Sequence, residues 1–163
     1  VYPVIQAKHI TNEILSFEDA RFLNAIDYDR YKNKYKPIKN EILISNIGTL
    51  GKIVLVEDEL EFLIAWNIFK VTLNLNICNS KFILYSLKQV ASNGYFERVK
   101  TGNATKFVKK DDMLAISVEL PELSEQQKIA HFLSAIDDKI NLVNQELEKT
   151  QEYKKGLLQQ MFV

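Results

Sequence analysis

Residues 121–140 read PELSEQQKIAHFLSAIDDKI, and this stretch divides the chain into two regions of different pattern. Ser124 and Gln127 have the spacing of a capping box, in which each side chain bonds to the other residue's backbone N–H at the start of a helix. From Ser124 onward the chain has one glycine and no proline. We therefore expect a single helix over residues 124–163, about 60 Å long at 1.5 Å per residue.

Apolar residues on this expected helix repeat with a seven-residue period. They alternate at spacings of four and three, as in the a and d positions of a coiled coil. The expected interface residues are Ile129, Leu133, Ile136, Ile140, Val143, Leu147, Leu157 and Met161. Each of the first six would contribute about 1.5–3 kcal/mol if buried, before the entropy of ordering is counted. The pattern therefore predicts that a partner helix covers this one.

Residues 1–123 carry the mixed signals of an α/β domain. Apolar, β-branched and aromatic runs favour strands at 41–47, 52–56, 62–66 and 68–73, the first two joined as a hairpin by the glycine turn 48–51. Further expected elements are a helix over 80–92, a shorter helix over 17–26 with Ser16 as N-cap, and a strand over 113–120. The expected fold class is α+β, with a globular domain over 1–123 followed by a long coiled-coil helix over 124–163.

The composition argues against several classes of protein. The 21 basic and 21 acidic residues cancel, so any nucleic-acid surface must come from local clusters of charge. One cysteine and two histidines make a disulfide framework or a zinc site unexpected, and the five glycines fit no common nucleotide-binding loop. No apolar run approaches the ~20 residues that span a bilayer. We therefore expect a non-catalytic, cytoplasmic chain with no cofactor or metal of its own. Its start, Val1-Tyr2-Pro3, suggests a trimmed sequence.

Two basic clusters and one glycine turn are candidates for contacts with DNA. Lysine and arginine supply affinity by neutralising phosphates, while amide and hydroxyl groups can reach base edges. For each candidate the alternative is ordinary solvated surface or turn chemistry. Trp66 and Asn67 are assigned to core packing plus a turn, with readout of a base as the alternative. The candidates are Arg30, Lys32, Lys34 and Lys36 in the first cluster, Asn46, Thr49 and Lys52 at the turn, and Arg98, Lys100, Thr101, Asn103, Thr105 and Lys106 in the second cluster.

Several strings resemble one protein family. PELSEQQKIA at 121–130, with FL at 132–133 and IDDKI at 136–140, resembles the conserved helical region of type I restriction-modification specificity subunits. The ending KKGLLQQMF at 154–162 is similarly typical of that family. Weaker similarity to the family's target recognition domains is carried by ILIS at 42–45, GTLGKI at 48–53, WN at 66–67 and GNA at 102–104.

The resemblance implies a division of labour. A specificity subunit normally has two target recognition domains, each reading half of a bipartite site in double-stranded DNA, and two helices that pair as an antiparallel coiled coil and dock the modification subunits. The modification subunit binds S-adenosylmethionine and methylates adenine N6, while cleavage belongs to the restriction subunit. With one domain and one helix, this chain looks like half of such a subunit, either the C-terminal half or an excised fragment. Its helix would pair with a second helix in cis or with another copy as a homodimer.

A second hypothesis remains open, in which the chain is a coiled-coil scaffolding module that reads no DNA. The two hypotheses differ in where they expect the basic clusters. Grouping of residues 30–39 and 98–110 on one face would favour DNA recognition, because a duplex is met by one surface. Scattering of the two clusters would favour scaffolding.

Overall fold

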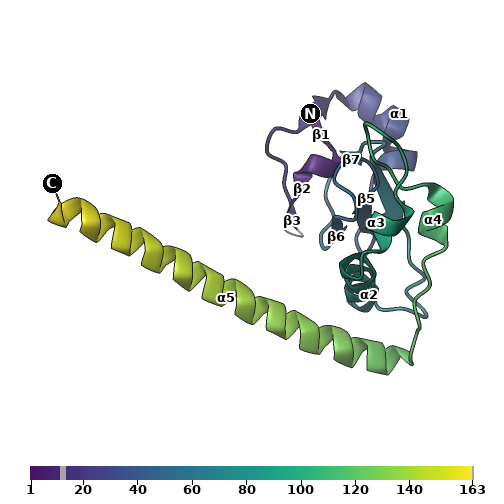
Figure 1. The fold of residues 1–163 in the computed structure, drawn as a ribbon. Coiled ribbons are helices and arrows are strands. Elements are labelled where there is room, and N and C mark those ends of the chain that lie inside the picture. The colour runs from purple at the N-terminus through teal and green to yellow at the C-terminus, as the bar shows by residue number, and fades with distance from the viewer. Residues whose placement is uncertain (12–13, 163) are drawn as a thin grey trace.

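The computed structural model describes residues 1–11 and 14–162 and shows a globular domain from which one long helix, α5, extends (Figure 1). The strands are β1 (Tyr2–Ile5), β2 (Ile10–Thr11), β3 (Ile14–Leu15), β4 (Arg21–Leu23), β5 (Ile42–Ser45), β6 (Ile53–Leu55), β7 (Leu63–Ile64) and β8 (Ile68–Val71). The helices are η1 (Ala7–His9, a 3-10 turn), α1 (Ala25–Tyr35), α2 (Ser80–Ser92), α3 (Tyr95–Val99), α4 (Lys110–Leu114) and α5 (Leu123–Met161).

An antiparallel sheet in the order β6–β5–β8 forms the centre of the domain. Ile42 of β5 lies opposite Leu55 of β6 and Val71 of β8. Every residue of β5 is buried, so its sequence is apolar almost throughout instead of alternating with polar residues. The predicted hairpin and the predicted strand over 68–73 are confirmed.

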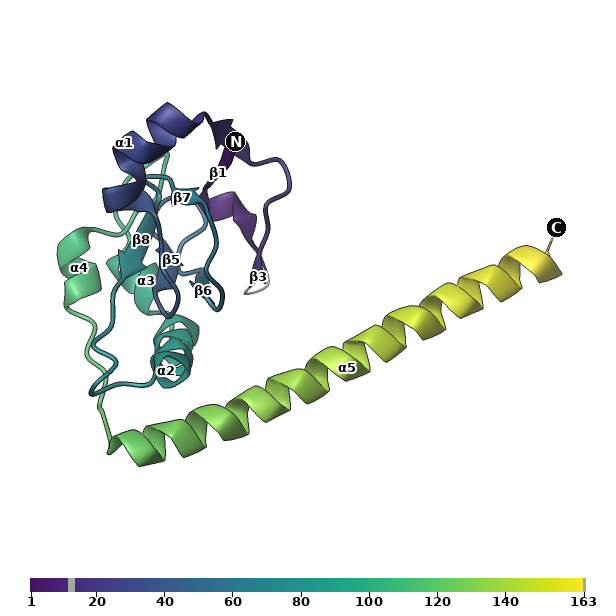
Figure 2. The ribbon, with the colours of Figure 1, turned by 180° about the vertical axis from the view of Figure 1, so that it is seen from behind.

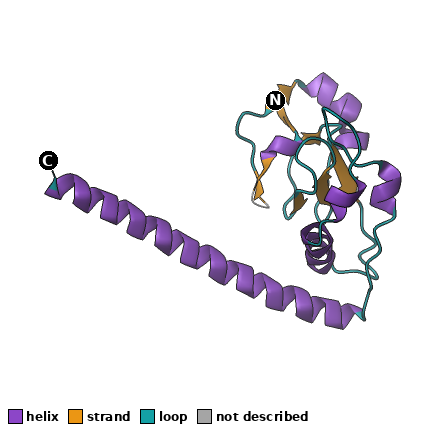
Figure 3. Cartoon of the chain, in the orientation of Figure 1, coloured by secondary structure: helices purple, strands orange, loops and turns teal. Residues whose placement is uncertain are grey.

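Successive residues of β5 enter hydrophobic cores on opposite faces of this sheet, as the two-residue period of a strand requires. Ile42 and Ile44 pack in a core that includes residues of α2, α3 and α5, whereas Leu43 packs in a second core that includes residues of β1 and β7. A second sheet, β4–β1–β7, holds β1 parallel to β7. In Figure 3 the purple α-helices lie around the central orange strands, while β2 and β3 lie at the edge of the domain.

The helix expected over 80–92 is confirmed as α2, but the one expected over 17–26 is wrong. Ser16 accepts a hydrogen bond from the N–H of Glu18 at 3.2 Å, which closes a local turn, and Asp19 has a positive φ of 55° that no helix continues through. The helix of this region is α1. Asn24 caps it by accepting from the N–H of Asp27 at 2.8 Å.

The strand expected over 113–120 is also wrong. Residues 110–114 form α4, and the carbonyl of Asp112 accepts a hydrogen bond from the Tyr95 hydroxyl at 2.6 Å. Beyond it, Ile116 and Val118 pack against the first core while residues 117 and 119 are exposed. The alternation that predicted a strand therefore reflects one-sided packing of an extended segment rather than pairing in a sheet.

Helix α5 begins at Leu123, one residue earlier than expected, and Glu122 is its N-cap residue. In the described part of the chain no side-chain hydrogen bond caps this end, so the predicted capping box of Ser124 and Gln127 does not form. The helix has 39 residues, about 58 Å at 1.5 Å per residue. Figure 2 shows its C-terminal part running away from the domain.

Candidate nucleic-acid interface

Three loops of the domain are tied together by backbone hydrogen bonds. The N–H of Asn46 donates to the carbonyl of Asn67 at 3.2 Å, and the N–H of Val108 donates to the carbonyl of Asn46 at 2.9 Å. The N–H of Gly48 donates to the carbonyl of Lys106 at 3.0 Å. We call the resulting surface the joined loops: residues 46–51 between β5 and β6, 65–67 between β7 and β8, and 100–109 between α3 and α4.

The first of the joined loops is a tight turn organised by Ser45. Its hydroxyl donates to the carbonyl of Thr49 at 2.5 Å and accepts from the N–H of Lys52 at 2.9 Å. Gly48 and Gly51 have φ angles of 80° and 70°, which favour glycine. As a result Thr49 is exposed at the tip of the turn and Lys52 is half-buried at its base.

The loop between α3 and α4 is closed at its neck and exposed beyond it. Thr101 and Phe107 exchange two backbone hydrogen bonds of 2.8 and 2.9 Å. Gly102 has a φ of 95°, and the ammonium of Lys106 donates to its carbonyl at 2.6 Å. Residues 102–107 are exposed, so the side chains of Asn103 and Thr105 are available to a partner.

Asn46, a predicted DNA contact, lies beneath this surface. Only 6% of its surface is exposed, and its backbone links the other two loops. Its side-chain Oδ1 is buried and has no hydrogen-bond partner among the described residues. Asn46 is therefore placed to hold the joined loops together rather than to meet a duplex directly.

Trp66 lies on the outside of the joined loops, so its assignment to the core is wrong. Its side chain is 76% exposed, although Ile64 and Ile68 on either side of it are buried. Asn67 is the structural member of the pair: its carbonyl binds Asn46, and its side-chain oxygen accepts from the N–H of Ala7 at 3.4 Å. Whether each of these two residues faces outward or inward depends on the backbone path of residues 65–67, which no sequence pattern indicated.

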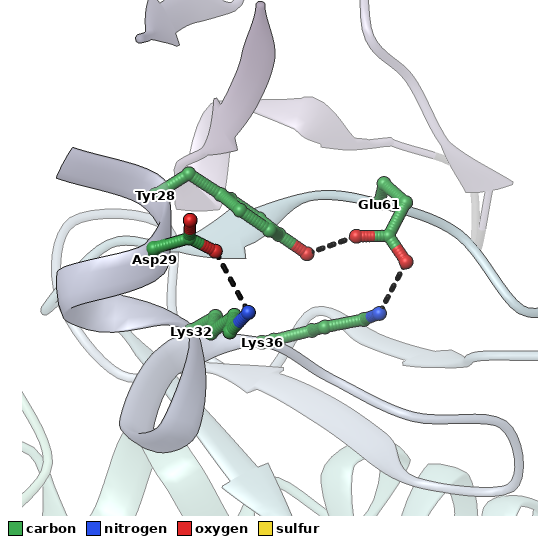
Figure 4. Close-up of polar contacts among 5 residues, drawn as sticks. All are labelled: Tyr28, Asp29, Lys32, Lys36 and Glu61. Carbon is green, nitrogen blue, oxygen red and sulfur yellow. Dashed lines mark hydrogen bonds and ion pairs between the residues drawn. The ribbon is translucent and has the colours of Figure 1, made fainter. Parts of the chain in front are cut away.

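The first basic cluster lies on and just after α1, and part of its charge is already paired (Figure 4). Lys32 contacts Asp29 at 2.7 Å, and Lys36 forms an ion pair with Glu61, which also accepts a hydrogen bond from the Tyr28 hydroxyl. The contact with Lys36 holds the pKa of Glu61 below its usual range and raises the pKa of Lys36. Both amino groups are therefore less available to phosphates than the sequence suggested.

The remaining cations of this cluster lie over aromatic rings. The Arg30 guanidinium is 5.7 Å from the Tyr31 ring centre, and the Lys34 ammonium is 5.1 Å from that of Tyr35. Both side chains are on exposed residues. A cation over a ring keeps its charge, so these two groups remain available to an anionic partner.

Two cations of the second cluster also have partners within the domain. Lys100 forms an ion pair with Glu97, and the Arg98 guanidinium donates to the carbonyl of Asn93 at 2.5 Å. Lys106 likewise donates to the carbonyl of Gly102. Within the ranges 1–11 and 14–162, none of Lys52, Arg98 and Lys106 forms an ion pair. Among the predicted DNA contacts, the cations outside the ion pairs of the described residues are therefore Arg30, Lys34, Lys52, Arg98 and Lys106.

Figures 1 and 2 show where these segments lie relative to α5. In both views α1 is at the end of the domain away from α5, and the green loop between α3 and α4 rises to the same end. Helix α1 and the loop between α3 and α4 therefore lie at the same end of the domain, whereas α3, which carries Arg98, packs against α2. The grouping that favours DNA recognition over scaffolding thus holds for α1 and this loop.

The base of α5 is fixed to the domain by Gln126, which is fully buried. Its side-chain oxygen accepts from the N–H of Asn79 at 2.9 Å, next to the start of α2. Its amide nitrogen donates to the carbonyls of Ile77 at 3.1 Å and Pro121 at 2.8 Å. One side chain thus ties the start of α5 to the segment 77–79, which is far from it in the sequence. Its neighbour Gln127 is exposed and does not share this role.

A second polar contact lies three turns further along α5. The Tyr85 hydroxyl of α2 donates to a carboxylate oxygen of Asp137 at 2.7 Å and lies 3.3 Å from the Ser134 hydroxyl. Burial, together with Asp137, raises the pKa of Tyr85 to about 12. Between the two polar contacts Ala130 is buried and Ile129 packs against the first core.

The apolar stripe of α5 is therefore divided between two environments. Ile129 and Leu133 are half-buried at the domain, so the expectation that the stripe serves a partner helix along its whole length needs correcting at these two positions. Farther along, the stripe is exposed at Ile136, Ile140, Val143, Leu147, Leu157 and Met161. Only this second part is free for another helix.

The described ranges contain neither a metal site nor a membrane-spanning helix. No group of three or more histidine, cysteine, aspartate and glutamate side chains there is arranged to hold a metal ion. None of the helices there is long and apolar enough to cross a lipid bilayer.

Comparison with known proteins gives a consistent result. A model of the type I restriction modification DNA specificity domain matches residues 1–152. The putative type I restriction enzyme MjaX specificity subunit of Methanocaldococcus jannaschii is 25% identical over 166 residues, covering 99% of this chain and 39% of the relative. The putative specificity subunit S.HindORF215P of Haemophilus influenzae is 28% identical over 148 residues, covering 86% of this chain and 37% of the relative.

Solved structures share the fold. The HsdS subunit from Thermoanaerobacter tengcongensis matches with a TM-score of 0.68 at 14% identity, over 98% of this chain and 41% of that one. The S subunit from M. genitalium matches with a TM-score of 0.57 at 19% identity, over 93% of this chain and 35% of that one. The predicted fold class, a mixed α and β domain with a long C-terminal helix, is confirmed. The chain spans well under half the length of each of these proteins.

Proposed function

Because the chain belongs to the family of type I restriction-modification DNA specificity domains, we propose that its globular domain reads one half of a bipartite target in double-stranded DNA. The joined loops are the observation that carries this proposal. Backbone hydrogen bonds hold the three loops in one surface, while Thr49, Asn103, Thr105 and Lys106 are exposed on it. Loops positioned by a rigid sheet are where binding residues concentrate in folded domains.

The proposal divides the contacts by chemistry. Lys52 and Lys106 neutralise phosphates, together with Arg30 and Lys34 of α1, because all four are outside the ion pairs of the described residues. The amide of Asn103 and the hydroxyls of Thr49, Thr101 and Thr105 hydrogen-bond with base edges. Lys32, Lys36 and Lys100 contribute less, since each forms an ion pair with a carboxylate of the domain.

The exposed part of the α5 stripe carries assembly in this proposal. Ile140 lies on the stripe and also lines a groove of about 590 Å³ between α5 and the domain, which includes Leu84 and Tyr85 of α2. A helix placed along α5 would cover the stripe and enter this groove. That helix comes from the rest of a full-length subunit or from a second copy of this chain, which would give a two-fold dimer with two reading domains.

The complete system divides its tasks among chains. This chain catalyses no reaction and supplies specificity, while the modification subunit that docks on it binds S-adenosylmethionine and methylates adenine N6. The restriction subunit joins the same assembly. Reading a second half-site on the same duplex raises the overall affinity, because the second binding event is intramolecular.

A methylation experiment tests the proposal. Residues 1–122 replace one recognition domain of a compatible specificity subunit, which is expressed with its modification subunit, and N6-methyladenine is mapped in the host DNA. We expect a new half-motif. The matched control carries Asn103→Ala and Thr105→Ala. Both residues are exposed, so the double substitution should leave folding intact. Methylation directed by this variant should lose the half-motif or become less specific for it.

The outcome separates recognition from scaffolding. A hybrid subunit that folds and co-purifies with the modification subunit but directs no new methylation would contradict DNA reading and favour the scaffolding module. An unchanged half-motif in the Asn103→Ala, Thr105→Ala control would leave DNA reading in place but move base contacts away from the loop between α3 and α4.

A further inference from the structure

Trp66 is the only tryptophan of the chain, and the fold places it on the surface. It follows β7 and precedes β8, two strands whose nearest residues, Ile64 and Ile68, are both buried. The link 65–67 thus turns a large aromatic side chain outward between two core positions. Tryptophan combines a large apolar face with one N–H donor, and it is strongly enriched at contact surfaces for that reason.

The neighbours of Trp66 in the fold indicate the chemistry of its partner. Asn67 is bonded to Asn46, and Asn46 is bonded in turn to Val108. At the spacing of hydrogen-bonded strands, three such segments span roughly 10 Å. Trp66 therefore lies beside the same two loops, one with the half-buried Lys52 at its base and the other with the exposed Lys106. Neither lysine forms an ion pair in the described ranges. An aromatic face beside cations with no carboxylate partner suits a partner with both negative charge and flat rings, which is the chemistry of a nucleic acid.

We propose that the indole of Trp66 stacks on a base of the bound duplex, at a step opened where the joined loops meet the DNA. This inference rests on the proposed function and adds a named contact and a mode of binding to it. Lys52 and Lys106 contact phosphates of the DNA backbone, and the indole takes the place of a neighbouring base in the stack. Apolar side chains inserted at base steps act in this way, and the bending that they cause makes a binding site sensitive to sequence.

The single tryptophan makes this contact directly measurable. The full chain is titrated with a duplex carrying the half-motif found by the methylation experiment, while indole emission is recorded. Stacking on a base quenches indole emission, so we expect marked quenching with the matching duplex and less with a scrambled one. No other tryptophan contributes to the signal.

Substitutions measure how much the contact contributes. Stacking of one base is worth enough that Trp66→Ala should weaken binding of the matching duplex by about 5- to 150-fold. Trp66→Phe keeps an aromatic face and should recover most of that loss. Phe22→Ala is the matched control, because Phe22 is also a highly exposed aromatic residue, at 59%, but belongs to β4 outside the joined loops. Its binding should equal that of the wild type.

Each outcome bears on a different claim. Suppose that the matching duplex binds the wild-type chain without quenching its indole emission, and that Trp66→Ala binds the same duplex with unchanged affinity. This inference is then overturned and the proposed function stands. If Trp66→Ala binds DNA normally but no longer co-purifies with the modification subunit, the residue serves a protein contact and the inference is again overturned. If the wild-type chain binds no duplex, the proposed function fails first. The thermal midpoint of each variant confirms folding, and Trp66→Gln, which also lacks an aromatic face, replaces Trp66→Ala if the alanine variant unfolds.

Discussion

Replacing Gln126 with leucine should detach the base of α5 from the domain. Leucine is similar to glutamine in size, so the change removes hydrogen bonds while leaving a small cavity at most. The buried side chain makes three such bonds, to Asn79, Ile77 and Pro121. At about 1 kcal/mol for each, the free energy of unfolding should fall by about 3 kcal/mol.

Thermal unfolding measures this loss. For a chain of this size, 1 kcal/mol corresponds to roughly 2–4 °C, so the midpoint should fall by about 6–12 °C. Gln127→Leu is the matched control, since it places the same substitution one residue away on the exposed side of the helix. Its free energy of unfolding should change by no more than about 0.5 kcal/mol.

A second measurement tests the geometric consequence of the same change. Spin labels on the domain and on the distal part of α5 report the distance between them, and Gln126→Leu should broaden the distribution of that distance. Equal midpoints for the Gln126 and Gln127 variants would refute the reasoning about stability. A distribution as narrow as that of the wild type would show that apolar packing at Ile129 and Ala130 orients the helix without Gln126.

The remaining predictions concern titration, assembly, loop shape and charge. Because the pKa of Tyr85 is raised to about 12 in the fold, its contribution to stability is complete below about pH 10 and is lost as pH rises toward 12. Denaturant unfolding at a series of pH values measures this loss of stability, which should be absent in Tyr85→Phe. The double variant Ile136→Asp, Ile140→Asp should sediment as a monomer if copies pair through α5, and a surviving dimer would place the interface elsewhere. In Gly102→Ala, the new Cβ would lie 2.2 Å from the carbonyl oxygen of Thr105, so half-site affinity should fall while Gly156→Ala, which has open space around it, should not affect binding. Lys106→Ala should reduce the slope of log affinity against log salt concentration by about 0.9. Lys36→Ala should reduce this slope less, because Lys36 is paired with Glu61. Equal slopes for the two variants would show that this ion pair does not keep Lys36 from binding phosphate.

Local signals in the sequence predicted the elements that depend on local chemistry. The apolar runs around the glycine turn became β5 and β6, and the spacing of apolar residues over 80–92 became α2. The predictions of secondary structure were wrong where the same local signal is compatible with two different structures. Ser16 caps a turn instead of a helix, and the alternation at Ile116 and Val118 reflects packing on a core without a partner strand.

The candidate site was predictable only in part, for the same reason. The sequence located the glycine turn and both basic clusters, but it could not distinguish paired from unpaired cations: Lys36 meets Glu61 across 25 positions of the chain, whereas Lys106 meets no carboxylate in the described ranges. It also gave no signal that Trp66 faces outward or that Asn46 is buried.

By itself, the sequence determined the class of the chain: an α+β domain, a long helix with an apolar stripe, and no common catalytic or cofactor motif. These features follow from periodicity and composition, which are properties of residues close together along the chain. Tertiary structure alone decided that Gln126 rather than Gln127 anchors α5, that the stripe is divided between the domain and a free surface, and that three distant loops form one face. Those outcomes depend on hydrogen bonds between segments far apart in sequence, whose geometry is set only when the sheets and helices pack.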